Sequence, residues 1–313
     1  MKRTWIYNAT IVNEGLKFAG SVVVEDDTIC EVLQGEVRPS VPCDAEIDAR
    51  GCYLIPGVID DHVHFRDPGL THKADMASET AAAAAGGVTS FMDMPNCNPQ
   101  TTTLEALENK FADAANKCIV NYSFYFGATN NNTELLQQLD KKHVCGVKLF
   151  MGASTGNMLV DRIESLRKIF SEAGILIAAH CEDQTIIRWN TELVKSKYGE
   201  EDVDILFHPR IRSEEACWRS SSLAVQLAKE TGARLHILHV STARELELFE
   251  DKPISEKKIT SEACVSHLMF CDEDYKTLGA RIKCNPSIKT KNDRDMLRRA
   301  LTTNRIDVIG TDH

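Results

Sequence analysis

The chain lacks any uninterrupted apolar run of about 18 residues, the length that a membrane-spanning helix requires. Its N-terminal segment also lacks the apolar core of a signal peptide, so the sequence predicts a cytoplasmic protein without a membrane partner. Positive charge is scarce, and the formal net charge of -10 argues against nucleic acid as the main partner. A local basic pocket is still compatible with that charge.

No two of the 11 cysteines form a C-x-x-C pair. Zinc–thiolate clusters depend on such close spacing, so the sequence argues against this class of site. Scattered cysteines in a chain of 313 residues instead indicate reduced, mostly buried thiols, as in cytosolic proteins. The 43% hydrophobic content is typical of a folded globular protein.

The first 53 residues differ from the rest of the chain in their pattern of predicted secondary structure. Short alternating segments between turn signals predict strands at residues 4–8, 11–12, 21–25, 29–33 and 46–48. A sheet of this size is too small to bury a large core by itself. We therefore expect residues 1–53 to form part of a small β-sheet module, followed by a larger domain at residues 54–313.

From residue 54 onward, apolar runs alternate with helical segments. The predicted strands are residues 54–63, 88–94, 120–126, 146–150, 176–180, 235–239, 259–263 and 306–311. The predicted helices are residues 75–85, 104–115, 161–173, 214–231 and 293–302, and an unusually long loop or helix spans residues 184–211. This alternation predicts a parallel (β/α)8 barrel, an α/β fold whose active sites lie at the C-terminal ends of the strands.

Two histidines stand at the end of the first predicted barrel strand. Side chains on a strand alternate between its faces, so His62 and His64 project from the same face and can coordinate one metal ion. A His-x-His pair on a strand is also common as two exposed histidines without a function. By itself the pair therefore leaves open whether it binds a metal ion. Further strand ends carry polar residues that favour the metal site: Lys148, His180, His239 and Asp312.

Several motifs give the chain a resemblance to a known family. They are Pro56-Gly57-x-Ile59-Asp60-x-His62-x-His64, Phe65-Arg66-Asp67-Pro68-Gly69, Met94-Pro95-Asn96, Lys148-Leu149-Phe150-Met151, His180-Cys181-Glu182, His239-Val240-Ser241-Thr242, Asn285-Pro286 and Gly310-Thr311-Asp312-His313. Together they make the chain similar to the cyclic-amidohydrolase branch of the amidohydrolase superfamily, most closely to class I dihydroorotases. The resemblance covers essentially the whole chain and implies a (β/α)8 barrel joined to a small β-sandwich.

The resemblance implies two zinc ions. The implied ligands are His62, His64 and Asp312 for the more buried ion, and His180 and His239 for the second. Lys148 would bridge both ions as a carbamate formed with carbon dioxide, although some class I members use an aspartate in this role. A lysine in a dry site beside two cations must shed its proton, and a carbamate suits metals about 3.5–4 Å apart.

The same resemblance implies hydrolysis of a cyclic amide. A hydroxide bridging the zinc ions would attack the ring carbonyl, with Asp312 as general base and then general acid. The substrate would be dihydroorotate, opened reversibly to N-carbamoyl-L-aspartate in pyrimidine biosynthesis. Related enzymes that open hydantoins, dihydropyrimidines or allantoin share these ligands, so the ligands alone do not identify the ring.

Four residues would contact the substrate. Arg66 is the discriminating one, because dihydroorotate carries an exocyclic carboxylate that a guanidinium binds with two parallel hydrogen bonds. Its alternative is a salt bridge with Asp67 at the rim. Asn96 and Asn285 match the family's positions for contacting the carboxylate and the ring, although both could be turn residues beside proline. His313 follows the base and would also reach the substrate.

The chain stops directly after the eighth predicted strand, where family members continue. We therefore expect either a fragment or a chain whose missing surface another chain supplies. A catalytically silent scaffold is the alternative to an enzyme, but all the ligand positions are retained, which favours the enzyme. A homodimer and a carbamoyltransferase partner both stay open. The loop at residues 152–157 is either a lid over the substrate or a plain connection.

Overall fold

Two structural units make up the chain in the computed structural model, Met1–Val58 and Ile59–His313. The structure describes residues 1–152, 158–199 and 203–313, so the loop considered above as a lid lies outside the described residues apart from Gly152. The domain boundary predicted from the sequence, after residue 53, lies five residues before this division. Within the described ranges, no helix is both long and apolar enough to span a bilayer.

The first unit is a five-stranded sheet. Its strands are β1 (Arg3–Asn13), β2 (Leu16–Glu25), β3 (Thr28–Gln34), β4 (Ala45–Asp48) and β5 (Tyr53–Leu54). The order is β3-β2-β1-β4, with β5 also paired to β1. The first three strands pair antiparallel, and β4 and β5 run parallel to β1. Ala9, Ile11 and Val22 form its small buried cluster.

Strand β1 replaces two predicted strands at residues 4–8 and 11–12. Asn8 lies between them with φ of 59°, in the left-handed region that asparagine tolerates better than most residues. The register with β2 shifts between Ile6 and Ala9, as at a β-bulge, and pairing then continues to Asn13. The prediction of two strands was wrong because the bulge bends the strand without ending it.

The second unit is a parallel barrel of eight strands. In spatial order they are β6 (Val58–Val63), β7 (Val88–Asp93), β8 (Asn121–Gly127), β9 (Gly146–Phe150), β10 (Ile177–His180), β11 (Leu235–Ile237), β12 (Ile259–Cys264) and β13 (Val308–Gly310). The edges of β6 and β13 meet just beyond β13. There the Asp312 amide donates to the His62 carbonyl (2.9 Å) and the His64 amide to the His313 carbonyl (2.6 Å). The predicted (β/α)8 fold is confirmed.

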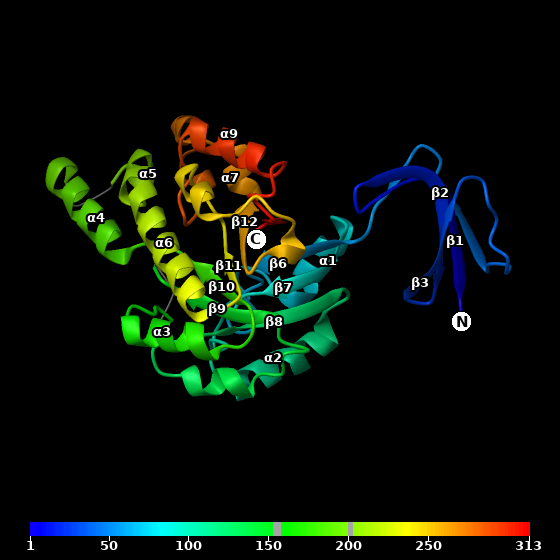
Figure 1. Cartoon of the computed structure of the whole chain (residues 1–313), viewed down its shortest axis with the longest axis horizontal. Coiled ribbons are helices and arrows are strands. Elements are labelled where there is room, and N and C mark those ends of the chain that lie inside the picture. The colour runs from blue at the N-terminus through cyan, green and yellow to red at the C-terminus, as the bar shows by residue number, and fades with distance from the viewer. Residues whose placement is uncertain (153–157, 200–202) are drawn as a thin grey trace. The chain divides into compact units, whose positions relative to one another are not determined.

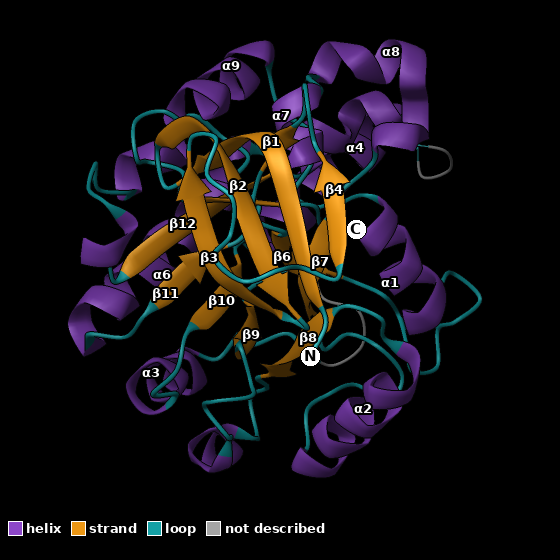
Figure 2. Cartoon of the chain, turned by 90° about the vertical axis from the view of Figure 1, so that its right-hand side faces the viewer, coloured by secondary structure: helices purple, strands orange, loops and turns teal. Residues whose placement is uncertain are grey.

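Helices lie around the outside of the barrel strands (Figure 1, Figure 2). They are α1 (Met76–Ala85), α2 (Leu104–Lys117), α3 (Ile163–Glu172), α4 (Gln184–Tyr198), α5 (His208–Ile211), α6 (Glu214–Thr231), α7 (Val265–Met269), α8 (Tyr275–Leu278) and α9 (Lys291–Ala300). The short 3-10 helices are η1 (Thr133–Gln138), η2 (Ile205–Phe207), η3 (Arg244–Leu248), η4 (Ile254–Glu256), η5 (Asp272–Asp274) and η6 (Gly279–Ile282).

The clearest differences from the sequence prediction lie in two parts of the barrel. The predicted strand at residues 54–63 is interrupted at Pro56, because proline has no amide to donate to a ladder. Tyr53–Leu54 therefore pairs with β1, and the barrel strand begins at Val58. Helices α7 and α8 were missed because four or five residues carry too little periodicity to be recognised.

A buried ion pair in the barrel positions the segment that follows the first strand. Nζ of Lys110 on α2 lies 2.5 Å from Oδ2 of Asp93 at the end of β7. Oδ1 of Asp93 accepts the amide of Phe65 (2.8 Å), and Lys110 also donates to the Met94 carbonyl (3.0 Å). The pair thereby fixes the two loops that carry His64, Arg66 and Asn96.

Candidate metal centre

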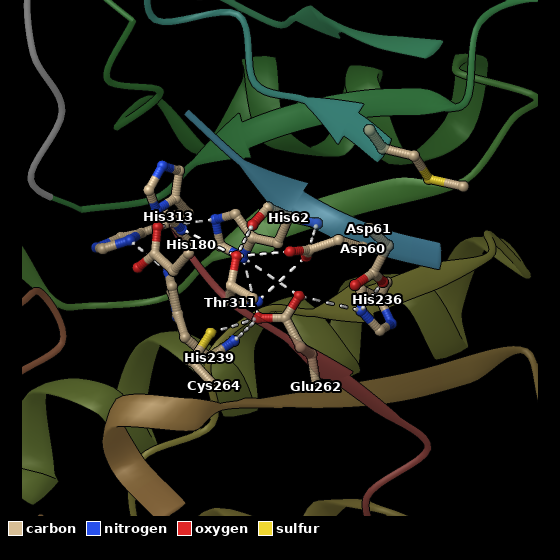
Figure 3. Close-up of polar contacts among 12 residues, drawn as sticks. Asp60, Asp61, His62, His180, His236, His239, Glu262, Cys264, Thr311 and His313 are labelled. Atoms are coloured by element: carbon tan, nitrogen blue, oxygen red, sulfur yellow. Dashed lines mark hydrogen bonds and ion pairs between the residues drawn. The ribbon is translucent and has the colours of Figure 1, made fainter. Parts of the chain in front are cut away.

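The predicted metal ligands come from five strands that run in the same direction. They are His62 on β6 and His64 directly after it, Lys148 on β9, His180 at the end of β10, His239 after β11 and Asp312 after β13. Parallel strands of a barrel end on one rim, so these side chains gather there. Figure 3 shows His62, His180 and His239 with their polar neighbours.

His62 and His64 share one carboxylate. Nε2 of His62 lies 3.2 Å from Oδ1 of Asp312, and Nε2 of His64 lies 3.1 Å from the same oxygen. The alternation of side chains along a strand turns both imidazoles to one side. A ligand atom from each of the three residues lies within 4.8 Å of the others, which is close enough for one ion.

His180 and His239 form a second pair next to the first. Nδ1 of His180 and Nε2 of His239 are 2.9 Å apart, and the two rings are nearly perpendicular. The ring centre of His239 lies 5.4 Å from that of His62. Two adjacent groups of nitrogen donors are therefore present, as a two-metal centre requires.

In three of the four histidines, the ring nitrogen that faces away from the centre (the outward nitrogen) is hydrogen-bonded to an oxygen that can only accept. Nδ1 of His62 lies 2.9 Å from Glu262, and Nδ1 of His64 lies 2.7 Å from Oδ1 of Asn96. Nε2 of His180 lies 2.9 Å from Glu182. Each outward nitrogen must carry a proton, so in the neutral ring the inward nitrogen presents its lone pair to the centre. This arrangement is typical of metal-binding histidines.

Lys148 is almost completely buried. Its ammonium group lowers the pKa of all four histidines, which indicates that it lies near each. Burial in turn lowers the pKa of Lys148 to about 8, although the carboxylates of Asp312 and Glu262 oppose the shift. A fraction of this amine is therefore neutral near physiological pH.

Charges within the cluster favour an ionised Asp312. Burial disfavours the charged form of that carboxyl, but His62 and His64 outweigh the effect and hold its pKa well below the usual range. Burial also disfavours the charged form of His62, yet Glu262 and Asp312 raise its pKa to about 10. Burial lowers the pKa of the other three histidines. Of the four imidazoles, His62 therefore holds a second proton most readily.

The donor set fits divalent metal ions. Nε2 of His62 is buried, and no hydrogen-bond partner for it exists among the described residues, although Oδ1 of Asp312 is 3.2 Å away. Buried polar atoms without a partner are rare. Zinc–nitrogen distances of about 2.0–2.1 Å in a tetrahedral site put two ligand nitrogens about 3.3 Å apart. The separation of the His180 and His239 nitrogens needs only a small adjustment to meet this value.

Three of the predicted site residues have backbone angles that are uncommon outside glycine. The angle φ is 63° at Arg66, 39° at His239 and 54° at Asp312. Such conformations cost about 1–3 kcal/mol each and persist where the surrounding structure holds them. Their concentration at one rim of the barrel points to a functional site.

Arg66 and Asn96 lie beside the first histidine pair. Nη1 of Arg66 donates to the carbonyl of Asn96 (3.3 Å), whose side chain contacts His64. The alternative salt bridge of Arg66 with Asp67 is not formed, because Asp67 pairs with Lys117 (3.0 Å). Asn96 thus contacts a candidate ligand directly, and substrate binding by either residue stays a prediction.

Asn285 and His313 lie apart from these contacts. Asn285 is exposed on the loop after η6. The imidazole of His313 forms an ion pair with Glu79 of α1 and lies edge-on to Phe65. Among the contacts that the described residues make, neither side chain touches a predicted metal ligand. Substrate binding by Asn285 and His313 also stays a prediction.

Three buried acidic residues support the site although none of them was predicted as a site residue. Glu262 contacts His62, and Glu182 contacts His180 and forms an ion pair with Arg212. Asp60 accepts the hydroxyl of Thr311 (2.6 Å) next to the barrel closure. The available signal was a carboxylate on or directly after an apolar strand, since a buried carboxylate requires partners.

The family model described as "Amidohydrolase family" matches residues 53–313. The chain belongs to the amidohydrolase family. A relative of this amidohydrolase, named allantoinase, from Deinococcus radiodurans is 33% identical over 282 residues, which cover 88% of this chain and 62% of the relative. A dihydroorotase from Methanosphaera stadtmanae is 29% identical over 293 residues, which cover 94% of this chain and 66% of the relative.

Solved structures of similar proteins are named hydantoinases, in addition to the allantoinase and dihydroorotase names of the relatives above. The L-hydantoinase (dihydropyrimidinase) from Arthrobacter aurescens has a TM-score of 0.90 and 27% identity, with 100% of this chain and 69% of that chain covered. A D-hydantoinase structure has a TM-score of 0.85 and 25% identity, with 99% of this chain and 68% of that chain covered. This amidohydrolase therefore spans 62% to 69% of the length of these proteins.

Proposed function

We propose that the chain is a zinc-dependent dihydroorotase, which opens the ring amide of (S)-dihydroorotate to N-carbamoyl-L-aspartate and can also close it. The observation that carries the proposal is the half-buried guanidinium of Arg66, linked through Asn96 to His64. Only one of its N–H groups has a partner among the described residues. The others are available for a carboxylate, which dihydroorotate carries outside its ring.

Two zinc ions would be held by the histidine pairs, Asp312 and Lys148, and would lower the pKa of a water and polarise the ring carbonyl. Lys148 would take part as a carbamate. Its neutral Nζ amine would form a bond to the carbon of carbon dioxide and release one proton. The low pKa of this buried lysine supports the step, because the neutral amine is the reacting form.

Asp312 would carry the proton of the reaction. Its Oδ1 contacts both His62 and His64, while the side chain keeps 19% of its surface exposed. Its low pKa suits a base that begins ionised. Asp312 would accept a proton from the attacking water and deliver it to the ring nitrogen as the carbon–nitrogen bond breaks.

An allantoinase is the second candidate, favoured by the 33% identity to the Deinococcus radiodurans relative. Allantoin carries a neutral ureido group where dihydroorotate carries a carboxylate, and hydantoins also lack that charge. A guanidinium aimed at either ring would stay without an anionic partner. Arg66 therefore favours dihydroorotate over the rings of the other named relatives.

Ring opening of dihydroorotate, allantoin and hydantoin by the zinc-loaded chain tests the proposal. We expect selective turnover of dihydroorotate. Arg66→Lys keeps the charge but loses the forked geometry, and should reduce kcat/KM by at least about 30-fold, or about 2 kcal/mol, at unchanged zinc content. Arg188→Lys on the exposed face of α4 is the matched control. Preferred turnover of allantoin, or full activity of Arg66→Lys, would contradict the substrate assignment.

A further inference from the structure

Glu262 on β12 is a fully buried carboxylate that touches both pairs of candidate metal ligands. Its Oε1 lies 2.9 Å from Nδ1 of His62 and accepts the backbone amide of His239 at 2.8 Å. The thiol of Cys264 donates to the same oxygen (3.0 Å). Figure 3 shows Glu262 together with His62, His239 and Cys264. One carboxylate thus joins a ligand of each predicted ion.

Histidines, and not a permanently charged side chain, are the ionic partners of Glu262 within the described ranges. No lysine or arginine pairs with it among the residues that the structure describes; its ionic partners are His62 and, at 3.9 Å, His236. His236 also faces Asp61 at 3.4 Å, so its charge is shared between two carboxylates. Burying a carboxylate is costly without a compensating charge. A metal ion bound at Nε2 of His62 would place a further positive charge close to this carboxylate.

Strand β13 leaves room for the contact between Glu262 and His62. A Cβ atom at Gly310 of β13 would lie 2.8 Å from Oε2 of Glu262 and 3.1 Å from Cβ of His62. Both distances are shorter than normal carbon contacts, so any larger residue would displace the carboxylate, the imidazole or both. Glycine at this position allows β12 and β6 side chains to meet next to β13.

We propose that Glu262 is a positioning residue shared by both metal sites. Through Nδ1 it holds the His62 ring with Nε2 directed at one ion, and through the amide of His239 it holds the backbone that presents the second ligand pair. The inference rests on the proposed two-metal function and assigns it a residue outside the ligand set. Glu182 is different, because it contacts His180 alone among the candidate ligands.

Metal affinity of Glu262→Gln tests the inference, because glutamine keeps the shape and removes the charge. Affinities for Zn²⁺ and Co²⁺ are measured by competition with a chelator. We expect binding to weaken about 10- to 100-fold, as when other partners of metal-bound histidines are lost. The visible absorption bands of the Co²⁺ form should shift because the His62 ligand is no longer held. The melting temperature of the metal-free variant should change by a few degrees at most.

Glu245→Gln is the matched control, since Glu245 is also buried but is bound by Ser221 and Thr242 instead of a histidine. It should leave the Co²⁺ spectrum and affinity unchanged. Parent-like affinity and spectrum in Glu262→Gln would overturn the inference. A parent chain that binds neither ion would instead overturn the two-metal function.

A measurement on the parent covers the case in which Glu262→Gln does not fold. Nitrogen-15 spectra of the histidine side chains in the zinc-loaded parent report which ring nitrogen of His62 is protonated, with His62→Asn used for assignment. A proton on Nδ1, shifted downfield by a carboxylate acceptor, supports the inference. A proton on Nε2 overturns it, because Glu262 could then not orient Nε2 toward an ion.

Discussion

At Lys148, burial and neighbouring carboxylates act in opposite directions. Burial is the larger effect and lowers the pKa to about 8, while Asp312 and Glu262 favour the charged form. At pH 7 about one tenth of the amine is neutral, compared with well under about 0.1% for a lysine with the usual pKa of about 10.4. The neutral amine, which is the form that reacts with carbon dioxide, is therefore more abundant here than at a surface lysine.

Reconstitution of the metal-free chain should follow the neutral form of Lys148. At constant dissolved carbon dioxide, the ratio of the zinc-uptake rates with and without carbon dioxide should rise about tenfold from pH 6 to 7 and level off above pH 8. The ratio is used because loss of the His62 proton, whose pKa is about 10, affects both rates alike. Lys148→Ala should lose the dependence on carbon dioxide and bind fewer than two zinc ions, with partial rescue by short carboxylic acids. Stopped-flow metal uptake and metal analysis measure both. Full zinc occupancy in Lys148→Ala would exclude a bridging role.

Residue by residue, the sequence predicted the candidate ligands better than their partners. His62, His180 and Asp312 could be selected because barrel topology brings every strand end to one rim. Glu262 was missed because a glutamate near a strand end can equally face solvent. Its contact with His62 joins positions 200 residues apart, and no local pattern contains that information. Metal binding by the selected residues stays a prediction.

Among the elements, α2 and β7 depend on one buried ion pair. Lys110 and Asp93 are both almost inaccessible to water, and Asp93 also holds the amide of Phe65. Because Lys110 also bonds the Met94 carbonyl, removing it affects both loops beside the first histidine pair. The pair therefore links the stability of the barrel to the geometry of its rim.

Lys110→Met should destabilise the chain by about 3–5 kcal/mol, because it leaves the Asp93 carboxylate buried without its cation. Urea unfolding measures the loss. Lys291→Met is the control, since Lys291 and Asp295 form an exposed pair on α9, and it should cost less than about 0.5 kcal/mol. Equal stabilities of the two variants would show that the buried pair contributes nothing specific.

Element boundaries could be predicted where the chain signals them strongly. The predicted helix at residues 214–231 has the bounds of α6, because Ser213 caps its start and Gly232, with φ of 74°, ends it. The predicted strand at residues 146–150 equals β9. Strand β1 was divided wrongly, because a bulge at Asn8 resembles a turn when only local sequence is considered.

On the scale of the whole molecule, the eleven free thiols fall into different environments. Cys30 and Cys52 are exposed, whereas Cys217 on α6 is buried. Burial raises the pKa of Cys217 to about 12, so its reactive thiolate is scarce at neutral pH. Thiol reactivity therefore reports on the integrity of the fold.

Brief treatment of the native chain with iodoacetamide should modify Cys30 and Cys52 and leave Cys217 unmodified. After unfolding in urea, all three should react at similar rates, because accessibility and pKa then become equal. Peptide mass spectrometry after digestion measures the extent at each site. Modification of native Cys217 as fast as Cys52 would mean that α6 opens readily or packs differently.

The closure of the barrel gives the candidate centre a mechanical consequence. His62 belongs to the first barrel strand and Asp312 follows the last, so one ion held by both would cross-link residues 250 positions apart. Closing a loop of this length with a permanent cross-link removes on the order of 5 kcal/mol of chain entropy from the unfolded state. The ion would hold the first and last barrel strands together, so that metal binding and closure of the barrel become one event.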